Sequence, residues 1–308
     1  MQVPAQLGLV VHPRRDVDGA LDTVRDWAAA HGVAVGQVSI PGQPRQVADA
    51  VEPAACDLVL ALGGDGTTLA ALHAAAPVGR PVLGVACGSI GLLTSVQVED
   101  LSAGLEQVAA GRWSRRVLPA LEVAAQGHEP RFALNDFVVI RDGTGQVILS
   151  IAIDGELYAR TAGDGLVVAT PLGSSAYTMA AGGPILGPGI TGMVVVPLAP
   201  HGGVSPPLVV GPESRVTLSV EMGYGGGRFE IDGQVLATTA AAVTVSHRGE
   251  YATMVALADQ EPLLTSLRRR GLVVDAPRIL ARDARDRAGL TAQAADGPPA
   301  PGRRTAPR

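Results

Sequence analysis

The chain has 308 residues, of which 47% are hydrophobic and 17% charged, and its formal net charge is −5. This length predicts two domains that each bury a hydrophobic core, while the acidic balance argues against a nucleic-acid partner. No apolar run reaches the length of a membrane span, and the absence of Lys excludes a Walker-type phosphate-binding loop.

The two cysteines predict the compartment. Cys56 and Cys87 lie among small or apolar residues without the spacing of metal ligands, which favours free, buried thiols over a disulfide. The first eleven residues lack a basic segment followed by a cleavage site. We therefore expect a cytoplasmic protein.

Strands and helices are predicted to alternate over residues 1–112. The predicted strands cover 7–11, 33–40, 57–62 and 81–86, and the predicted helices cover 16–30, 46–51, 67–76 and 100–110. This alternation is typical of a parallel, Rossmann-like sheet, so we expect an α/β N-terminal domain.

A glycine-rich loop follows the third predicted strand. The apolar run 57–62 continues directly into Gly63-Gly64-Asp65-Gly66-Thr67. Glycines at the carboxyl end of a strand let backbone N–H groups approach phosphate oxygens. Asp65 is the one acid in this loop. It could act as a base that takes a proton from an attacking hydroxyl, or as a metal ligand. The alternative is a tight turn in which Asp65 caps the next helix.

Short strands replace this pattern from residue 113 onward. They are predicted at 117–125, 132–141, 147–153, 166–170, 193–197, 208–210, 216–220, 228–231, 243–247 and 252–257. Only 174–181 and 262–270 are predicted as helices, so we expect a β-rich domain over 113–257. Segment 258–278 is expected to return to the first domain, and the composition of 279–308 predicts a disordered tail.

Two polar residues interrupt one of these strands. Asn135 and Asp136 stand inside the apolar run 132–141, which indicates a bulge or a site. An amide beside a carboxylate suits the vicinal hydroxyls of a ribose. The sequence Ile231-Asp232-Gly233-Gln234 favours a hairpin turn, and His73 and His201 favour structural roles.

The segment 163–177 is the richest in motif residues. A second Gly-Asp-Gly element leads through an apolar strand to Thr170-Pro171, and then to a predicted helix that opens with Ser174 and Ser175. A helix start flanked by hydroxyl groups suits an anion, and the ring of Tyr177 could stack on a base. The alternative is an ordinary capped helix with a packed Tyr.

Taken together and in this order, the motifs over 7–257 resemble those of the NAD kinase family. The motifs on which this resemblance rests are Gly63-Gly64-Asp65-Gly66-Thr67, 81–85 with Gly88 and Gly91, Asn135-Asp136, Asp164-Gly165, 170–177 and Gly182-Gly183-Pro184. The first motif is shared with other kinases, whereas the run 170–177 with its trailing Gly-Gly-Pro is highly specific.

The resemblance implies an activity and an assembly. The family transfers a phosphoryl group from ATP, or in some members from inorganic polyphosphate, to the 2′-hydroxyl of the adenosine ribose of NAD, giving NADP. Its members have an α/β N-terminal domain and a β-rich C-terminal domain. Mg²⁺ would arrive with the nucleotide, and the assembly would be a homodimer or homotetramer.

The resemblance also implies roles for individual residues. Asp65 would accept the hydroxyl proton, and the phosphates would be bound by Gly63, Gly64, Gly66 and Thr67. The implied NAD-binding residues are Asn135, Asp136, Asp164, Thr170, Leu172, Ser174, Ser175, Ala176, Tyr177, Ala180 and Gln234. In this set Asn135 and Asp136 would bind the adenosine half, Asp164 would lie near the nicotinamide, and 175–177 would line the adenine pocket.

The chain departs from the family pattern at three places. The family usually has Glu at Asp136 and often Ser at Ala180, and segment 202–206 lacks the Ser-Leu-Ser and Arg that commonly follow His201. These departures bear on substrate affinity, on the choice between NAD and NADH, and on subunit contacts.

Two other functions remain open from the sequence. A lipid kinase of the diacylglycerol kinase type shares the Gly-Gly-Asp-Gly-Thr loop but gives no account of the run 170–177. A NAD-binding regulator without turnover is suggested by Asp136 and Ala180, although it leaves Asp65 without a purpose.

Overall fold

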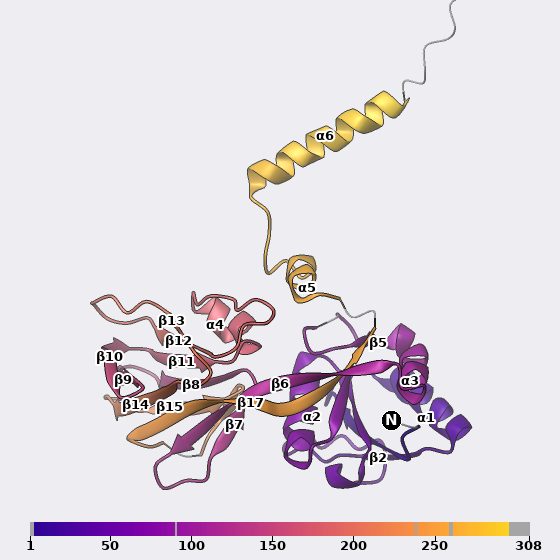
Figure 1. Ribbon diagram of the computed structural model, residues 1–308, viewed down its shortest axis with the longest axis horizontal. Helices are drawn as coiled ribbons and strands as arrows, with labels where there is room; N and C mark the ends of the chain where they lie inside the picture. The colour runs from indigo at the N-terminus through magenta and orange to yellow at the C-terminus, as the bar shows by residue number, and fades with distance from the viewer. Residues whose placement is uncertain (1–2, 90, 238, 259–260, 296–308) are drawn as a thin grey trace, which may run out of the picture. The chain divides into compact units, whose positions relative to one another are not determined.

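The computed structural model describes residues 3–89, 91–237, 239–258 and 261–295. The chain forms two compact units, 1–260 and 261–308. The first unit begins with alternating strands and helices and continues into a β-rich part (Figure 1).

The predicted parallel sheet is confirmed in the α/β part. Its elements are β1 (Gln6–Val11), α1 (Asp18–His31), β2 (Ala34–Gln37), β3 (Leu58–Gly63), α2 (Asp65–Ala75), β4 (Pro81–Ala86), β5 (Val96–Gln97) and α3 (Leu101–Ala109), with the 3₁₀ turns η1 (Pro53–Ala55), η2 (Ala76–Val78) and η3 (Val98–Asp100). The strands run parallel in the order β2-β1-β3-β4-β5. All six residues of β3 are buried because helices cover both faces of this sheet.

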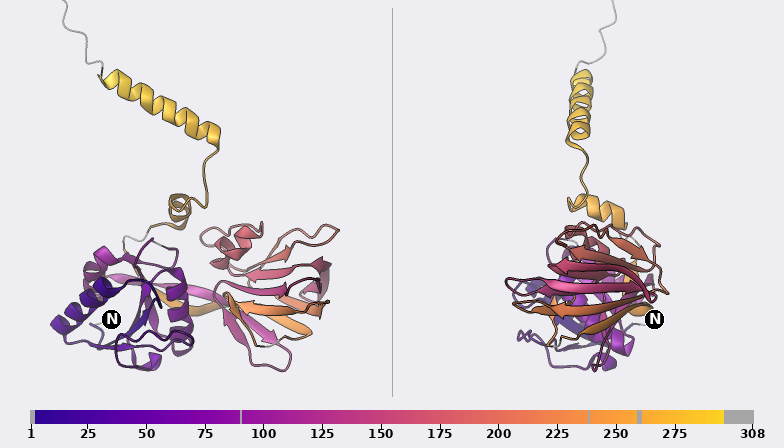
Figure 2. Two further views of the ribbon diagram at one scale, coloured as in Figure 1. Left: turned by 180° about the vertical axis from the view of Figure 1, so that it is seen from behind. Right: turned by 90° about the vertical axis from the view of Figure 1, so that its left-hand side faces the viewer.

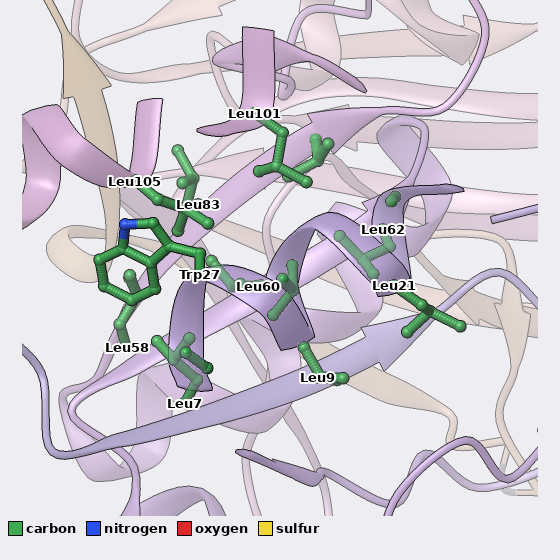
Figure 3. Close-up of a cluster of buried hydrophobic side chains, with 14 of the residues drawn as sticks. Leu7, Leu9, Leu21, Trp27, Leu58, Leu60, Leu62, Leu83, Leu101 and Leu105 are labelled. Carbon is green, nitrogen blue, oxygen red and sulfur yellow. The ribbon is translucent and has the colours of Figure 1, made fainter. Parts of the chain in front are cut away.

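Alternate residues of β3 enter two different cores. Leu58, Leu60 and Leu62 pack with α1 and α3 in the cluster shown in Figure 3. Val59 and Ala61 pack on the opposite face, against α2. The period of two along a strand therefore fixes β3 between the helices and holds its carboxyl end, where the glycine loop starts, in one position.

The β-rich part consists of two packed sheets. Its strands are β6 (Trp113–Ala125), β7 (Arg131–Ala133), β8 (Asp136–Arg141), β9 (Val147–Ile153), β10 (Glu156–Gly163), β11 (Gly165–Ala169), β12 (Met193–Leu198), β13 (Leu208–Val210), β14 (Arg215–Met222), β15 (Gly227–Ile231), β16 (Gln234–Val235) and β17 (Ala242–Leu257), and it also holds η4 (Gly173–Ser175) and α4 (Tyr177–Ala180). One sheet has the order β13-β12-β11-β8-β15-β16, and the other places β10, β9 and β14 beside β17. Side chains of both sheets, among them Phe137, Leu149 and Phe229, form the core between them.

Strand β17 joins the two parts of the first unit. It pairs antiparallel with β14 near its start and parallel with β4 near its end, and it pairs with β6 along almost its whole length. The sequence predicted separate strands at 243–247 and 252–257; the structure joins them, with an irregularity in the β6 pairing between Arg248 and Ala252. Figures 1 and 2 show β6 and β17 passing together from the α/β part into the β-rich part.

The helix predicted over 46–51 is wrong. This segment is extended and lies beside β2, where the N–H of Val51 and the carbonyl of Asp49 bond to the backbone of Gln37. The Gln37 side chain also accepts from the N–H of Val47 at 2.7 Å. These bonds replace those of a helical turn.

The second unit contains α5 (Leu263–Arg269) and α6 (Pro277–Ala295). Helix α6 lies where the composition predicted a disordered tail. Ala, Leu and Arg are strong helix formers, Pro277 stands in the favoured first turn, and the next proline is Pro298. The tail predicted over 296–308 lies outside the described residues. The boundary at residue 112, and the return of 258–278 to the α/β part, stay predictions.

Within the described ranges, no helix combines the length and apolar character needed to cross a bilayer.

Candidate functional site

The glycine loop lines a pocket at the carboxyl end of the parallel strands. The pocket has a volume of about 250 Å³ and is lined by His12, Pro13, Arg15, Gln43, Gly64, Asp65, Gly66 and Thr67. Four of the five predicted loop residues therefore face one cavity. Gly63 is buried behind it, where a Cβ atom would lie 2.2 Å from the Thr67 hydroxyl, so only glycine fits there.

The Asp65 carboxylate is held by a second loop. Asp65 is the first residue of α2, and the N-cap position belongs to Gly64. Its Oδ2 accepts the N–H of Leu92 at 3.0 Å and its Oδ1 accepts the N–H of Leu93 at 2.8 Å. A Cβ atom on Gly91 would lie 1.8 Å from Oδ1, so a glycine is required for this close approach. The structure thus fixes the acid singled out from the sequence in one orientation beside the pocket.

Arg116, which the sequence patterns did not indicate, supports this loop from β6. Its Nη1 donates to the carbonyl of Leu92 at 3.2 Å. Burial lowers the pKa of Arg116, and the negative charge of Asp65 opposes this. In the sequence Arg116 is one of two adjacent arginines in a strand, and only the register of β6 distinguishes it from the exposed Arg115.

A third segment lines the pocket with His12, Pro13 and Arg15. The Nδ1 atom of His12 accepts the N–H groups of Arg14 and Arg15 at 3.1 and 2.9 Å. The guanidinium of Arg45 donates to the carbonyls of His12 and Arg15. Burial lowers the pKa of His12, and the charges of Arg15, Arg45 and Arg14 lower it further. His12 is thus kept neutral, as an acceptor at Nδ1 must be.

The predicted polar break in the strand 132–141 is confirmed, and Asp232 organises it. Strand β7 ends at Ala133 and β8 begins at Asp136. The Asp232 carboxylate accepts the N–H groups of Leu134, Asn135 and Asp136 at 2.7–2.9 Å. The break is therefore a turn of backbone wrapped around a buried acid.

Asp232 also binds the helix that carries Asp65. The Nε2 atom of His73 on α2 lies 2.6 Å from Asp232 Oδ2, and the Asp232 side chain is only 1% exposed. Asp232 itself stands at φ 50° in the turn between β15 and β16, so the predicted hairpin turn is confirmed. The pocket and the polar break are thus connected through α2.

Asp136 is a buried carboxyl beside two other acids. Its residue is 5% exposed. Burial, followed by the charges of Asp232 and Glu230, raises the pKa of Asp136 to about 7. The folded chain therefore binds this proton more tightly than the unfolded chain does.

This difference predicts a pH dependence of stability that Asp136 causes. Because the folded pKa is raised from 3.8 to about 7, stability is greatest below pH 4 and is lost as the pH rises through 7. At about 1.4 kcal/mol per pKa unit, the contribution of Asp136 falls by about 2 to 3 kcal/mol between pH 5 and pH 8.

Urea unfolding at pH 5 and pH 8 measures this change. In Asp136→Asn the loss should disappear, whereas the exposed Asp26→Asn should behave as the wild type does. The same pH dependence in wild type and Asp136→Asn would contradict the assignment.

Charged groups of the β-rich part act on the hydroxyl of Tyr177. Burial raises the pKa of Tyr177, the carboxylates of Glu230, Asp164 and Asp136 raise it further, and Arg228 opposes them. Tyr177 is 40% exposed, so its ring remains open to a ligand. Asp164 is bound by the guanidinium of Arg141, whose Nε lies 2.5 Å from Oδ1. Asp136 and Asp164 lie at opposite ends of the paired strands β8 and β11, because Asp136 pairs with Ala169 whereas Ile140 pairs with Gly165.

Other predicted residues support the backbone from inside. Thr170 and Ser174 are fully buried. The Thr170 hydroxyl donates to the carbonyl of Leu134, and the Ser174 hydroxyl donates to Pro171 and accepts the N–H of Leu186. They fix the segment next to the polar break.

The remaining members of the predicted set are more accessible. Asn135 and Leu172 are half-buried, whereas Ala176, Ala180 and Gln234 are exposed. Ser175 is 9% exposed and donates to the carbonyl of Leu172 at 3.1 Å.

The continuous helix predicted over 174–181, at whose start an anion site was expected, is wrong. The expected helix over 174–181 is divided into η4 and the four-residue α4, because Ala176 has φ −102° and ψ −122°, outside the helical region. So short a helix has little dipole, and the Ser174 hydroxyl is already bonded.

Comparison with known proteins decides the family. The sequence model of the ATP-NAD kinase N-terminal domain matches residues 7–113, and that of the ATP-NAD kinase C-terminal domain matches 134–253. A NAD kinase from Koribacter versatilis is 33% identical over 225 residues, which cover 69% of this chain and 78% of that protein. The chain belongs to the NAD kinase family.

Other relatives agree. A NAD kinase from Desulforamulus reducens is 33% identical over 74% of this chain and 83% of that protein. One from Heliobacterium modesticaldum is 38% identical over 58% of this chain, and the matched part spans 65% of that protein.

Solved structures show the same NAD kinase fold. A NAD kinase from Archaeoglobus fulgidus in complex with ATP superposes with a TM-score of 0.71 at 23% identity, over 85% of this chain and 98% of that one. Yeast NADH kinase complexed with NADH gives a TM-score of 0.70 at 20% identity, over 85% of this chain and 86% of that one. The predicted two-part fold is confirmed.

Proposed function

We propose that this chain transfers the terminal phosphoryl group of ATP to the 2′-hydroxyl of the adenosine ribose of NAD, giving NADP. The observation that carries the proposal is the Asp65 carboxylate, fixed by the N–H groups of Leu92 and Leu93 at the edge of a pocket with glycine walls. Membership of the NAD kinase family and the names of its relatives support the choice of substrates.

Each part of the site has a role in this reaction. Asp65 accepts the proton of the ribose hydroxyl as that oxygen attacks phosphorus. Gly64 and Gly66 line the pocket, where their amides would bind phosphate oxygens without side chains in between. The groups near the polar break, Asn135, Asp136 and Tyr177, hold the adenosine half of NAD. Orientation of the two substrates supplies most of the remaining rate enhancement.

The metal belongs to the nucleotide in this proposal. Among the described residues, no group of three or more His, Cys, Asp or Glu side chains could hold a metal ion. We therefore treat Mg·ATP as the substrate, with the cation bound by phosphate oxygens. Inorganic polyphosphate is a second candidate donor, because the pocket lining contains no Phe, Tyr or Trp side chain to select a base.

We also propose a cytoplasmic homo-oligomer, either a dimer or a tetramer. Both cysteines are free thiols, which fits a reducing compartment. Exposed apolar side chains at Leu157, Val204 and Tyr224 provide surface that subunit contacts could cover.

The purified full chain should form NADP when incubated with NAD and Mg·ATP, measured with an NADP-specific dehydrogenase. NAD lacking the 2′-hydroxyl is the matched control and should give no product. ATP hydrolysis without NADP, or NAD binding without turnover, would contradict the proposal; the latter result would indicate a regulator. Phosphorylation of diacylglycerol would indicate a lipid kinase.

A further inference from the structure

The geometry points to Arg15 as a catalytic residue that binds the transferred phosphoryl group of the donor, with Arg45 as a positioning residue for it. This inference rests on the proposed function, because it assigns the cation of that reaction's phosphate pocket.

Arg15 lines the same pocket as Asp65, Gly64 and Gly66. Its Nη1 donates to the carbonyl of Cys87, directly after β4, at 3.1 Å. A Cβ atom on Gly88 would lie 2.6 Å from this nitrogen, and one on Gly64 would lie 3.9 Å from it. The guanidinium therefore reaches across the ends of two neighbouring strands, and both strands are followed by glycine there.

The backbone that carries Arg15 is held from two sides. The N–H of Arg15 bonds to the ring of His12, and its carbonyl accepts from Arg45 at 2.6 Å. Arg45 is fixed in turn by an ion pair with Asp18 at 3.1 Å. The position of Arg15 is thus set before any ligand arrives, which reduces the entropy lost on binding.

Arg15 is the fixed positive charge of this pocket. Of the residues that line it, only His12 and Arg15 can carry a positive charge, and His12 is kept neutral by its surroundings. Within the described part of the chain Arg15 forms no ion pair with a carboxylate. Its remaining N–H groups can therefore donate to a ligand.

This arrangement matches the charge of phosphoryl transfer. Negative charge spreads over the three equatorial oxygens of the transferred group, and a guanidinium presents several N–H donors in one plane to such oxygens. Arg15 would bind the oxygens of the transferred group, while Asp65 would take the proton of the attacking hydroxyl. The chain contains no Lys that could take this role.

The test compares Arg15→Gln with Arg14→Gln. Arg14 is the adjacent arginine, it is exposed, and it does not line the pocket. We expect kcat for NADP formation to fall about 100-fold or more in Arg15→Gln, with KM for NAD within twofold of wild type. Arg14→Gln should stay within twofold in both constants. Arg15→Lys should recover part of the loss because it retains the charge.

A binding measurement separates this inference from the proposed function. Calorimetric titration with inorganic tripolyphosphate needs no turnover, and its affinity should fall at least tenfold in Arg15→Gln but not in Arg14→Gln. If wild type forms no NADP but this difference persists, the proposed function fails and the phosphate site stands. Equal kcat and equal tripolyphosphate affinity in the two variants would overturn the assignment of Arg15.

Discussion

Replacing Asp65 with Asn is expected to lower kcat for NADP formation at least 1000-fold, within the range lost with a general base. Asn has the same shape but no basic oxygen at neutral pH, so the ribose hydroxyl keeps its proton until it has attacked. KM for NAD should change less than threefold, because Asp136 and Tyr177 lie on other elements. Steady-state assays over a range of NAD and ATP concentrations measure both constants.

Stability must be measured beside this variant. Both oxygens of Asp65 accept backbone N–H groups, and the amide nitrogen of Asn would face one of these donors. We expect a cost of about 1 to 3 kcal/mol in unfolding free energy. Asp65→Ser should be as inactive, and its hydroxyl can rotate so that its oxygen accepts a backbone N–H of the loop. Retention of more than a tenth of wild-type kcat in Asp65→Asn would show that Asp65 is not the base.

The sequence predicted those parts of the site that depend on neighbours along the chain. The buried strand, the glycines after it and the helix that begins at Asp65 follow from local composition and periodicity. The parallel sheet follows from the alternation of elements. Each of these features is decided within about fifteen residues, where pattern and propensity act together.

Contacts between distant segments could not be predicted in the same way. Arg15 meets Cys87 across 72 positions, and Asp232 meets the backbone of 134–136 across 96 to 98 positions. Both depend on the register of strands, which a single sequence does not contain. The hairpin turn at Asp232 was predicted correctly from the sequence. The hydrogen bonds of its carboxylate to the backbone of 134–136 were not predicted.

Strand β10 was missed for a related reason. Its sequence alternates few apolar residues with Glu156, Arg160 and Thr161, and it forms the edge of the larger sheet. An edge strand needs little apolar surface, so the pattern that reveals a buried strand is weak there. The β9 partner supplies its hydrogen bonds, again through register.

Replacing Asp232 with Ala is expected to be the most destabilising single change near the site. The carboxylate accepts three backbone N–H groups and lies 2.6 Å from His73 Nε2, and the side chain is 1% exposed. Removing it leaves buried donors without an acceptor, which we expect to cost about 3 to 5 kcal/mol. Equilibrium urea unfolding measures this loss.

The same change should weaken NAD binding, because the backbone of Asn135 and Asp136 loses its anchor. We expect KM for NAD to rise at least tenfold in Asp232→Ala, while the phosphate pocket, assayed by tripolyphosphate titration, stays within threefold. Asp232→Asn is the matched control: it tolerates the φ of 50° and retains one acceptor oxygen. Its loss of stability should be about half that of Ala.

Asp232→Gly tests the backbone separately. Glycine adopts the same φ without strain, so any difference from Ala measures the left-handed conformation, which costs a non-glycine residue about 1 to 2 kcal/mol. If both Asp232→Ala and Asp232→Gly unfold within 1 kcal/mol of wild type and keep the wild-type KM for NAD, the buried carboxylate does not organise the polar break. The structure predicts instead that Gly remains destabilised by at least 2 kcal/mol, because the N–H groups of 134–136 still lack their acceptor.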